Sequence, residues 1–261
     1  MSRLNPSEHH HARMALFLAS AAVFGTIYVA ALASLHPMGV ADAASASYGD
    51  RINAATVSER HITDAVTAVN FDFRGFDTLG EEFIMFASVI GTILLLRKHR
   101  DESEGTPRDQ KAGREISPPS DAVRVISVSL AGMVVTFGIY IVTHGQVSPG
   151  GGFQGGVLLA APPLLIYLAG EFQQFCRLAP RPLVEAGEAV GAAGYAIIGV
   201  IPLFLHAAYL YNFLPLGTPG DIFSGGTVAL IDLTVGLEVA GGFIVLLLAF
   251  LEETLVRRDP A

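Results

Sequence analysis

The sequence predicts an all-α membrane protein that crosses the bilayer with six helices. Composition is the first reason: 51% of the 261 residues are apolar and 15% are charged, whereas a soluble domain carries roughly 25% charged residues. The second reason is that the apolar residues form long runs, close to the roughly 20 residues that a helix needs to cross the hydrocarbon core. These two properties exclude most soluble protein classes.

Charge and cysteine content narrow the function classes further. The formal net charge of −8 argues against a nucleic-acid-binding protein, which would carry a basic patch. The single cysteine, Cys176, excludes an intramolecular disulfide framework and a cysteine-rich metal site. We expect no cofactor and no metal site in this chain.

Six stretches qualify as membrane spans. They cover residues 14–35, 79–96, 123–143, 153–175, 187–211 and 226–251. The first is uncharged from Met14 to Leu35, and the second ends at the basic run 97–100. The third ends near His144.

The remaining spans are bounded by glycine and polar turns. The fourth starts in the glycine run after Pro149, and the polar turn 216–221 separates the fifth from the sixth. Pro162-Pro163 and Pro202 should interrupt the fourth and fifth helices, because proline removes a backbone donor and clashes with the preceding turn.

The distribution of basic residues predicts the orientation. Lysine and arginine in short loops stay cytoplasmic. With the N-terminus inside, only Arg51, Arg60 and Arg74 fall in a segment placed outside. Both termini should therefore lie in the cytoplasm. The protein itself should lie in the cell (inner) membrane. We expect the first span to remain uncleaved, because it is longer than a signal-peptide core; cleavage after residues 31–34 is the alternative and would leave five spans.

The polar segment between the second and third spans divides the chain. Residues 99–121 contain glycine, proline and mixed charges, which is typical of a flexible linker. The sequence thus predicts a two-span unit over residues 1–98, a cytoplasmic linker over 99–121 and a four-span domain over 122–261.

Acidic residues inside the spans are candidates for an ion path. A charge at the bilayer centre costs about 2.5–3.5 kcal/mol even on insertion scales. Asp232 and Glu238 both lie in the sixth span, but their directions differ by roughly 120°, so they cannot share one narrow face. No lysine or arginine lies deep in any span, so the partner of Glu238 should be water or another polypeptide.

Three further ionisable residues lie nearer the ends of their spans. They are His144, Glu171 and His206. Membrane proton relays use such residues, and we expect His144 or Glu171 near an exit. The competing interpretation is that each side chain simply reaches the interface.

A glycine-rich segment precedes the fourth span. Residues 149–156 read Pro-Gly-Gly-Gly-Phe-Gln-Gly-Gly. The spacing of Gly150, Gly152 and Gly155 resembles a dinucleotide fingerprint, but that motif needs a preceding strand. Glycines four residues apart instead predict a smooth face for close helix contact.

A second motif precedes the second span. Residues 69–81 read Val-Asn-Phe-Asp-Phe-Arg-Gly-Phe-Asp-Thr-Leu-Gly-Glu. Thr78 and Glu81 fit a capping box, and Arg74 could pair with Asp72 or Asp77. The spaced aromatic residues 71, 73 and 76 indicate an anchor at the interface or against a partner.

Together these two motifs resemble a known family. The glycine-rich segment resembles the signature of the B subunit of multisubunit Na⁺/H⁺ antiporters of the Mrp or Mnh type (MnhB/MrpB). Residues 69–81 resemble a segment near the C-terminus of the large A-type subunit, and small membrane subunits of complex I-related hydrogenases are similar. The matching motif residues are Asp72, Arg74, Gly75, Asp77, Gly80, Glu81, Pro149, Gly150, Gly151, Gly152, Phe153, Gly155 and Gly156.

The resemblance implies a non-catalytic subunit of a monovalent cation (Na⁺)/proton antiporter. Such a subunit would work in a hetero-oligomer with other antiporter subunits and would contribute part of a path for H⁺ and Na⁺. The alternative is a membrane-arm subunit of a complex I-related hydrogenase or another redox-driven ion pump, in which the redox centres belong to partners.

Overall fold

The prediction of six membrane-spanning helices is confirmed. The computed structural model describes residues 6–34, 47–96, 119–170 and 172–254, and every regular element within these ranges is helical. Six helices are long and apolar enough to cross a membrane. They are Arg13–Ala33, Gly75–Leu95, Asp121–Thr143, Gly152–Ala169, Arg181–Phe204 and Thr227–Glu252.

The chain consists of two compact units, Met1–Ser47 and Tyr48–Ala261. The first contains the single helix α1 (Pro6–Ala33). Its large apolar side chains are exposed within this unit, for example Phe17 and Phe24. A helix that is apolar on all sides needs lipid or another polypeptide around it.

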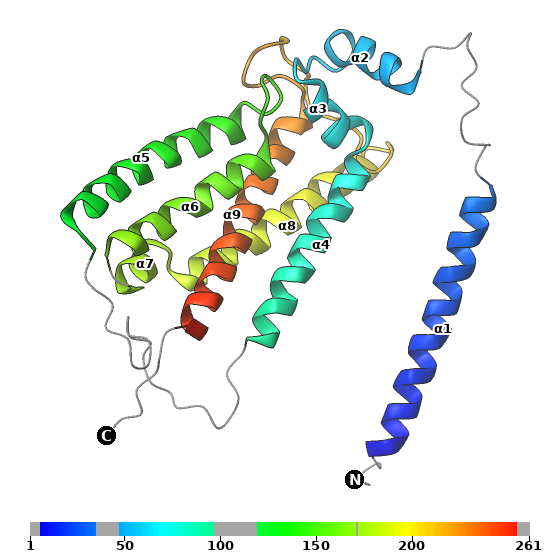
Figure 1. Ribbon diagram of the computed structural model, residues 1–261. Helices are drawn as coiled ribbons and strands as arrows, with labels where there is room; N and C mark the ends of the chain where they lie inside the picture. Colours follow the sequence, from blue (N-terminus) through cyan, green and yellow to red (C-terminus); the bar gives the residue numbers. More distant parts are fainter. Residues whose placement is uncertain (1–5, 35–46, 97–118, 171, 255–261) are drawn as a thin grey trace. The chain divides into compact units, whose positions relative to one another are not determined.

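The second unit is a helical bundle built around α9. It contains α4 (Gly75–Leu95), α5 (Asp121–Thr143), α6 (Gly152–Ala169), α8 (Arg181–Phe204) and α9 (Thr227–Thr254). Helix α9 packs against α4, α5, α6 and α8, and it lies among them in Figure 1. Half of the apolar window of α9 is buried, against 22% for α4 and α5, so α9 forms the core of the bundle.

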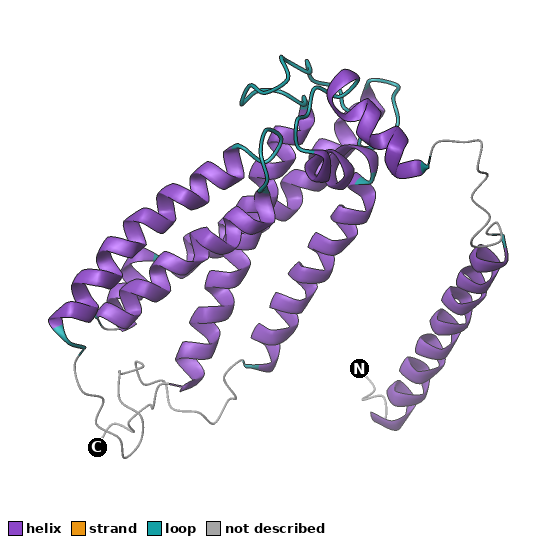
Figure 2. Cartoon of the chain, turned by 45° about the horizontal axis from the view of Figure 1, so that its top comes forward, coloured by secondary structure: helices purple, strands orange, loops and turns teal. Residues whose placement is uncertain are grey.

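Short helices close the two ends of this bundle. Helices α2 (Tyr48–Ser58), α3 (Ala65–Ala68) and the short π-helix η1 (Val69–Phe73) lie at the end where α4 and α9 begin. The teal loops in Figure 2 gather at the same end. At the other end, α7 (Phe172–Leu178) connects α6 to α8.

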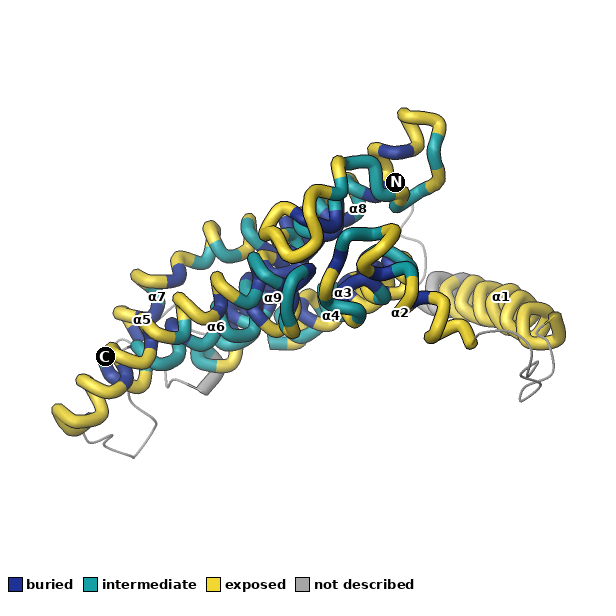
Figure 3. The backbone as a smooth tube through the Cα atoms, turned by 90° about the horizontal axis from the view of Figure 1, so that it is seen from above, coloured by how far each residue is buried: buried dark blue, intermediate teal, exposed yellow. Residues whose placement is uncertain are grey.

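Two apolar clusters stabilise these ends. The first centres on Tyr195, Phe71 and Ile231, and the second on Phe175, Phe172 and Leu248. Figure 3 shows buried residues in dark blue along the middle of the bundle and exposed ones in yellow on its outside. The buried carboxyl groups of the spanning helices lie on α4, α8 and α9.

The predicted limits of the fourth and fifth spans are wrong. Helix α6 ends at Ala169 instead of 175, and α8 covers 181–204 instead of 187–211. Pro180 is the N-cap residue of α8. The charged residues in the first two turns of α8 lower the hydropathy there, so a hydropathy estimate does not detect this helix start. Pro202 therefore lies in the last turn of the helix and does not break its middle.

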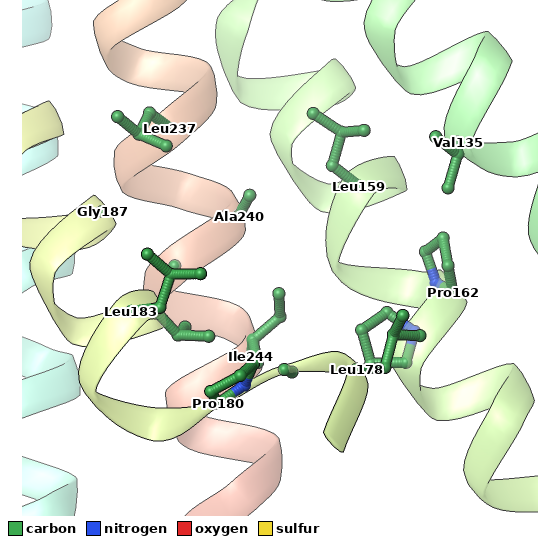
Figure 4. Close-up of a pocket in the computed structure, with 14 residues that line it drawn as sticks. Val135, Leu159, Pro162, Leu178, Pro180, Leu183, Gly187, Leu237, Ala240 and Ile244 are labelled. Atoms are coloured by element: carbon green, nitrogen blue, oxygen red, sulfur yellow. The ribbon is translucent and has the colours of Figure 1, made fainter. Parts of the chain in front are cut away.

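The expected interruption of the fourth span is also absent. Helix α6 continues through Pro162 and Pro163, which are both buried. They contribute to the wall of an apolar cavity of about 290 Å³ between α5, α6, α8 and α9 (Figure 4). The side chains around this cavity, such as Leu159, Leu183 and Leu237, are apolar, so it offers no groups that could carry an ion.

The capping-box prediction at the second span is wrong as well. Helix α4 begins at Gly75, so Thr78 lies inside its first turn. The Thr78 hydroxyl donates a 2.6 Å hydrogen bond to the carbonyl oxygen of Asn70. This bond ties α4 back to η1, and the helix start has no side-chain cap.

Candidate functional site

Four carboxyl groups are buried within the spanning helices. Asp232 and Glu238 of α9 are fully buried, Glu82 of α4 is 4% exposed and Glu188 of α8 is 5% exposed. Burying an ionised carboxylate in an apolar region is costly unless protons, donors or cations compensate it. The arrangement of these groups therefore defines the candidate site.

Three of these residues form one group, which we call the glutamate trio: Glu82, Glu188 and Glu238. Glu238 is close enough to interact electrostatically with both others. At least one carboxyl oxygen of each glutamate is buried without a hydrogen-bond partner, and both oxygens of Glu238 are. None of the ion pairs found in the described part of the chain includes them. The trio is thus an acidic group without a basic partner in these ranges.

Glycines allow the helices carrying the trio to approach closely. A Cβ atom on Gly191 of α8 would lie 2.7 Å from the Cα atom of Glu238. A Cβ atom on Gly241 of α9 would lie 2.8 Å from the Cβ atom of Glu188. Each helix therefore presents a glycine opposite the glutamate of the other, three residues beyond its own glutamate.

Asp232 has a different environment from the trio. Its Oδ1 atom accepts a 2.8 Å hydrogen bond from the backbone N–H of Gly152, the first residue of α6. The N-terminus of a helix favours a negative charge because its first N–H groups are free. The other oxygen, Oδ2, has no partner. Asp232 therefore joins α9 to the start of α6, whereas Glu238 faces α4 and α8.

The glycine-rich segment makes this contact possible. Gly150 and Gly151 have φ angles of 159° and 126°, which favour glycine. A Cβ atom on Gly152 would meet Val235 at 2.7 Å, and one on Gly156 would meet Val239 at the same distance. Gly155 instead packs against Val142 of α5. The glycines thus hold α6 between α5 and α9.

The second motif lies beside a polar cavity at the α2 end of the bundle. We call this cavity, of about 770 Å³, the vestibule; its lining residues are Arg60, Asp72–Asp77 and Ala208–Asn212. Both arginines are paired: Arg60 with Asp72 at 2.9 Å and Arg74 with Asp77 at 2.5 Å. Burial raises the pKa of Asp72 despite the opposing effects of Arg60 and Asn212.

The three aromatic residues of this motif have separate surroundings. Phe71 is buried and meets Tyr195 edge-on, with ring centroids 6.2 Å apart. Phe73 lies under the guanidinium of Arg60. Phe76 is 72% exposed, so only this one remains available at the surface. The expectation of a shared surface anchor is therefore wrong for Phe71.

His144 and His206, two other residues predicted for an ion path, do not gather around Glu238. His144 caps the C-terminus of α5 and stacks on Tyr140. His206 is exposed just after α8. Glu171 lies outside the described residues.

Sequence reasoning missed two members of the trio. Glu82 follows Glu81, which belongs to the predicted capping box, and Glu188 lies at the predicted start of the fifth span. The repeated spacing Glu-x-x-Gly at 188–191 and 238–241 is the signal that could have revealed the α8–α9 contact. No three histidine, cysteine or acidic side chains in the described ranges are placed to hold a metal ion.

Comparison with known proteins places these features in a family context. A family model described as a domain related to the MnhB subunit of Na⁺/H⁺ antiporter matches residues 122–245. An uncharacterized protein of Methanocaldococcus jannaschii is 30% identical over 213 residues, which are 73% of this chain and 78% of that protein. A Rhizobium meliloti protein described as a probable K⁺/H⁺ antiporter A/B subunit is 26% identical over 74% of this chain, which corresponds to 21% of that longer protein.

Two solved complexes contain chains of similar fold. One is the membrane-bound sulfane sulfur reductase, an archaeal respiratory membrane complex, with a TM-score of 0.66 and 28% identity over 92% of this chain and 98% of the other. The second is the Mrp complex from a Dietzia species, with a TM-score of 0.62 and 22% identity. There the match covers the whole of this chain and 27% of the other.

Proposed function

This chain belongs to the family of membrane proteins related to the MnhB subunit of Na⁺/H⁺ antiporters, and we propose that it is a non-catalytic subunit of a monovalent cation/proton antiporter complex in the cell membrane. In this proposal the chain supports assembly of the complex and contributes part of the ion path. Its partners are the other antiporter subunits, and Na⁺ is the proposed coupling ion.

One observation carries this proposal: the described spanning helices bury four carboxyl groups, each with at least one oxygen that has no hydrogen-bond partner. Apolar side chains of similar volume would stabilise the same contacts without a desolvation cost. Protons can neutralise carboxyl groups inside a bilayer, and proton relays are built from such residues. The trio and Asp232 therefore form the proposed proton-carrying part of the chain, with Glu238 at its centre.

The proposed path differs in composition from the one that the sequence suggested. Glu238 and Asp232 remain in it, and Glu82 and Glu188 join them because Glu238 interacts electrostatically with both. His144 and His206 lie outside this group of contacts, so we propose no role for them in proton transfer.

The test is Na⁺-dependent proton movement in everted vesicles that contain the assembled complex. Glu238→Gln should lower the rate strongly, because a glutamine has a similar shape but carries no transferable proton. Glu185→Gln, a change at a half-exposed glutamate paired with Arg181 on α8, is the control and should leave the rate unchanged. Wild-type transport by a fully assembled Glu238→Gln complex would remove Glu238 from the path.

A second candidate function is a membrane-arm subunit of a redox-driven ion pump. The match to the sulfane sulfur reductase complex favours it, because it covers nearly the whole of both chains. Electron transfer would then belong to partner subunits, since iron–sulfur clusters are usually held by four cysteines and this chain has one. Copurification from native membranes separates the two: antiporter subunits alone support the first function, and iron–sulfur subunits in the same complex support the second.

A further inference from the structure

The apolar cavity of Figure 4 lies in the part of the bundle that ends at α7. Its wall includes Val135 of α5, Pro162 of α6, Leu183 of α8 and Ile244 of α9, and Leu178 of α7 joins them. Every side chain in the lining is apolar, so ordered water would find too few hydrogen-bond partners there. An apolar ligand is therefore the occupant that fits this lining.

The cavity is open toward the surroundings of the bundle. Leu178, Leu183 and Leu237 line it and are 56%, 70% and 44% exposed. Helix α8 packs on α9 and α4, whereas α5 and α6 pack on each other and on α9. The opening therefore lies between α8 and the α5–α6 pair, with α9 as the wall that joins them (Figure 4). Between spanning helices, such an opening meets lipid or a partner subunit.

The volume of the cavity excludes a partner helix as the occupant. The cavity holds about 290 Å³. One turn of a helix, about 10 Å wide and about 5.4 Å long, would fill roughly 400 Å³. A lipid acyl chain is unbranched, much thinner than a helix and apolar along its length. It can follow an irregular apolar space without leaving polar groups unpaired.

A basic side chain marks the end of the cavity at α7. Arg177 is exposed and lies in the last turn of α7, directly before Leu178 of the lining. Arg177 belongs to none of the ion pairs found in the described ranges, whereas Arg181 pairs with Glu185 and Glu252. Basic residues beside pockets between spanning helices bind anionic lipid headgroups. The predicted orientation places this end in the cytoplasm, where anionic lipids make the leaflet negative.

We propose that this cavity binds an anionic phospholipid, with one acyl chain between α8 and the α5–α6 pair and its phosphate at Arg177. The chain lies against Gly187 and Gly241, which are both part of the lining. Gly241 is also where α9 meets Glu188, since a Cβ atom on Gly241 would lie 2.8 Å from the Cβ atom of Glu188. The lipid therefore supports the α8–α9 contact that buries Glu188. This inference goes beyond the proposed function, because it does not depend on the ion that the complex carries.

The direct test is photo-crosslinking in the assembled complex. The complex is reconstituted in nanodiscs that contain a phosphatidylglycerol with a diazirine near the end of one acyl chain. Irradiation should attach this lipid to residues 159–163 and 237–244, which peptide mass spectrometry locates. No transport is measured, so failure of the proposed function leaves the result unaffected. Absence of adducts from both segments overturns the inference, including the case in which a partner subunit fills the cavity.

Ala240→Phe tests whether the lipid lies inside the cavity. Ala240 lines the cavity and points into it in Figure 4, so a phenyl ring there takes up the space of the acyl chain. The adducts should fall several-fold. Ala193→Phe is the matched control, because Ala193 is exposed on α8 outside the lining, and its adducts should equal those of the wild type. Unchanged adducts in an assembled Ala240→Phe complex place the lipid on the outer surface and overturn the site.

Arg177→Gln tests the headgroup contact at an exposed position, where the change leaves the core intact. Unlabelled phosphatidylglycerol should compete with the probe several-fold better than phosphatidylcholine in the wild type, and Arg177→Gln should abolish this preference. Arg124→Gln, at an exposed arginine near the start of α5, is the control and should keep it. Equal competition by the two lipids in the wild type, or a preference that survives in Arg177→Gln, contradicts recognition of an anionic headgroup by Arg177.

Discussion

Glu81 and Glu82 are adjacent in the chain but have opposite environments. Glu81 is exposed on α4, whereas Glu82 is buried and interacts electrostatically with Glu238. Because one residue along a helix turns the side chain by about 100°, only one of the two can face the bundle. This difference makes the pair a matched test of the trio.

We expect Glu82→Gln to reduce antiport strongly and Glu81→Gln to leave it nearly unchanged. The first change removes a proton-carrying group from the trio, while the second removes an exposed charge. Rates measured in everted vesicles, normalised to the amount of assembled complex, provide the comparison. Equal effects of the two changes would show that burial does not distinguish these glutamates.

Asp232 should behave differently from the trio, because its Oδ1 atom satisfies the N–H of Gly152. Asp232→Asn keeps an oxygen in that position, whereas Asp232→Ala leaves the buried N–H without an acceptor. Such an unsatisfied donor costs about 1–3 kcal/mol. Asp232→Ala should therefore lower the melting temperature of the purified complex clearly more than Asp232→Asn. Identical melting temperatures would mean that the bond to Gly152 contributes little to stability.

At the scale of elements, the close approach of α8 and α9 depends on two glycines. A Cβ atom on Gly191 would lie 2.6 Å from the carbonyl oxygen of Thr234, and backbone at this distance cannot yield without moving a helix. Gly191→Ala should therefore destabilise the protein by about 1–3 kcal/mol, as overpacking typically does.

Gly132 of α5 provides the control for this change, because a Cβ atom there meets nothing within 4 Å. Gly132→Ala should be neutral or stabilising, since alanine is favoured over glycine in a helix by about 1 kcal/mol. Melting temperatures of the two variants in the same detergent test the difference. A Gly191→Ala protein as stable as wild type would show that the helices can separate freely at this point.

The spanning helices were predictable from sequence because lipid selects for apolar length, which hydropathy measures directly. The start of α8 was missed because its first turns carry Arg181, Glu185 and Glu188, charges that a hydropathy window excludes from a span. The structure shows that Arg181 pairs with Glu185, whereas Glu188 is buried against α9. Only tertiary packing separates an interfacial glutamate from a buried one.

The candidate site was predictable only where a single helix revealed it. Glu238 stands out in the sequence because it lies in the middle of an apolar span. Glu82 gives no such signal, since it follows an exposed glutamate near the start of a span. Its burial depends on how α4 meets α9, and that contact joins segments far apart in the chain.

At the scale of the whole molecule, the orientation in the membrane is still a prediction, and it decides which side of the membrane the vestibule faces. The short helices α2 and α3 and the loop between α8 and α9 share one end of the second unit. The distribution of lysine and arginine places the segments of that end outside. Arg60 and Arg74, two of the basic residues found there, are both paired with aspartates.

We therefore expect Thr218→Cys, in the loop after α8, to react with an impermeant thiol reagent in intact cells. Ser103→Cys, in the mixed-charge segment between the second and third spans, should react only in everted vesicles. Both variants would carry Cys176→Ser, so that each protein has one thiol. If the labelling pattern is reversed, the vestibule faces the cytoplasm. Arg177 would then lie on the outer side, and the positive-inside rule would fail for this chain.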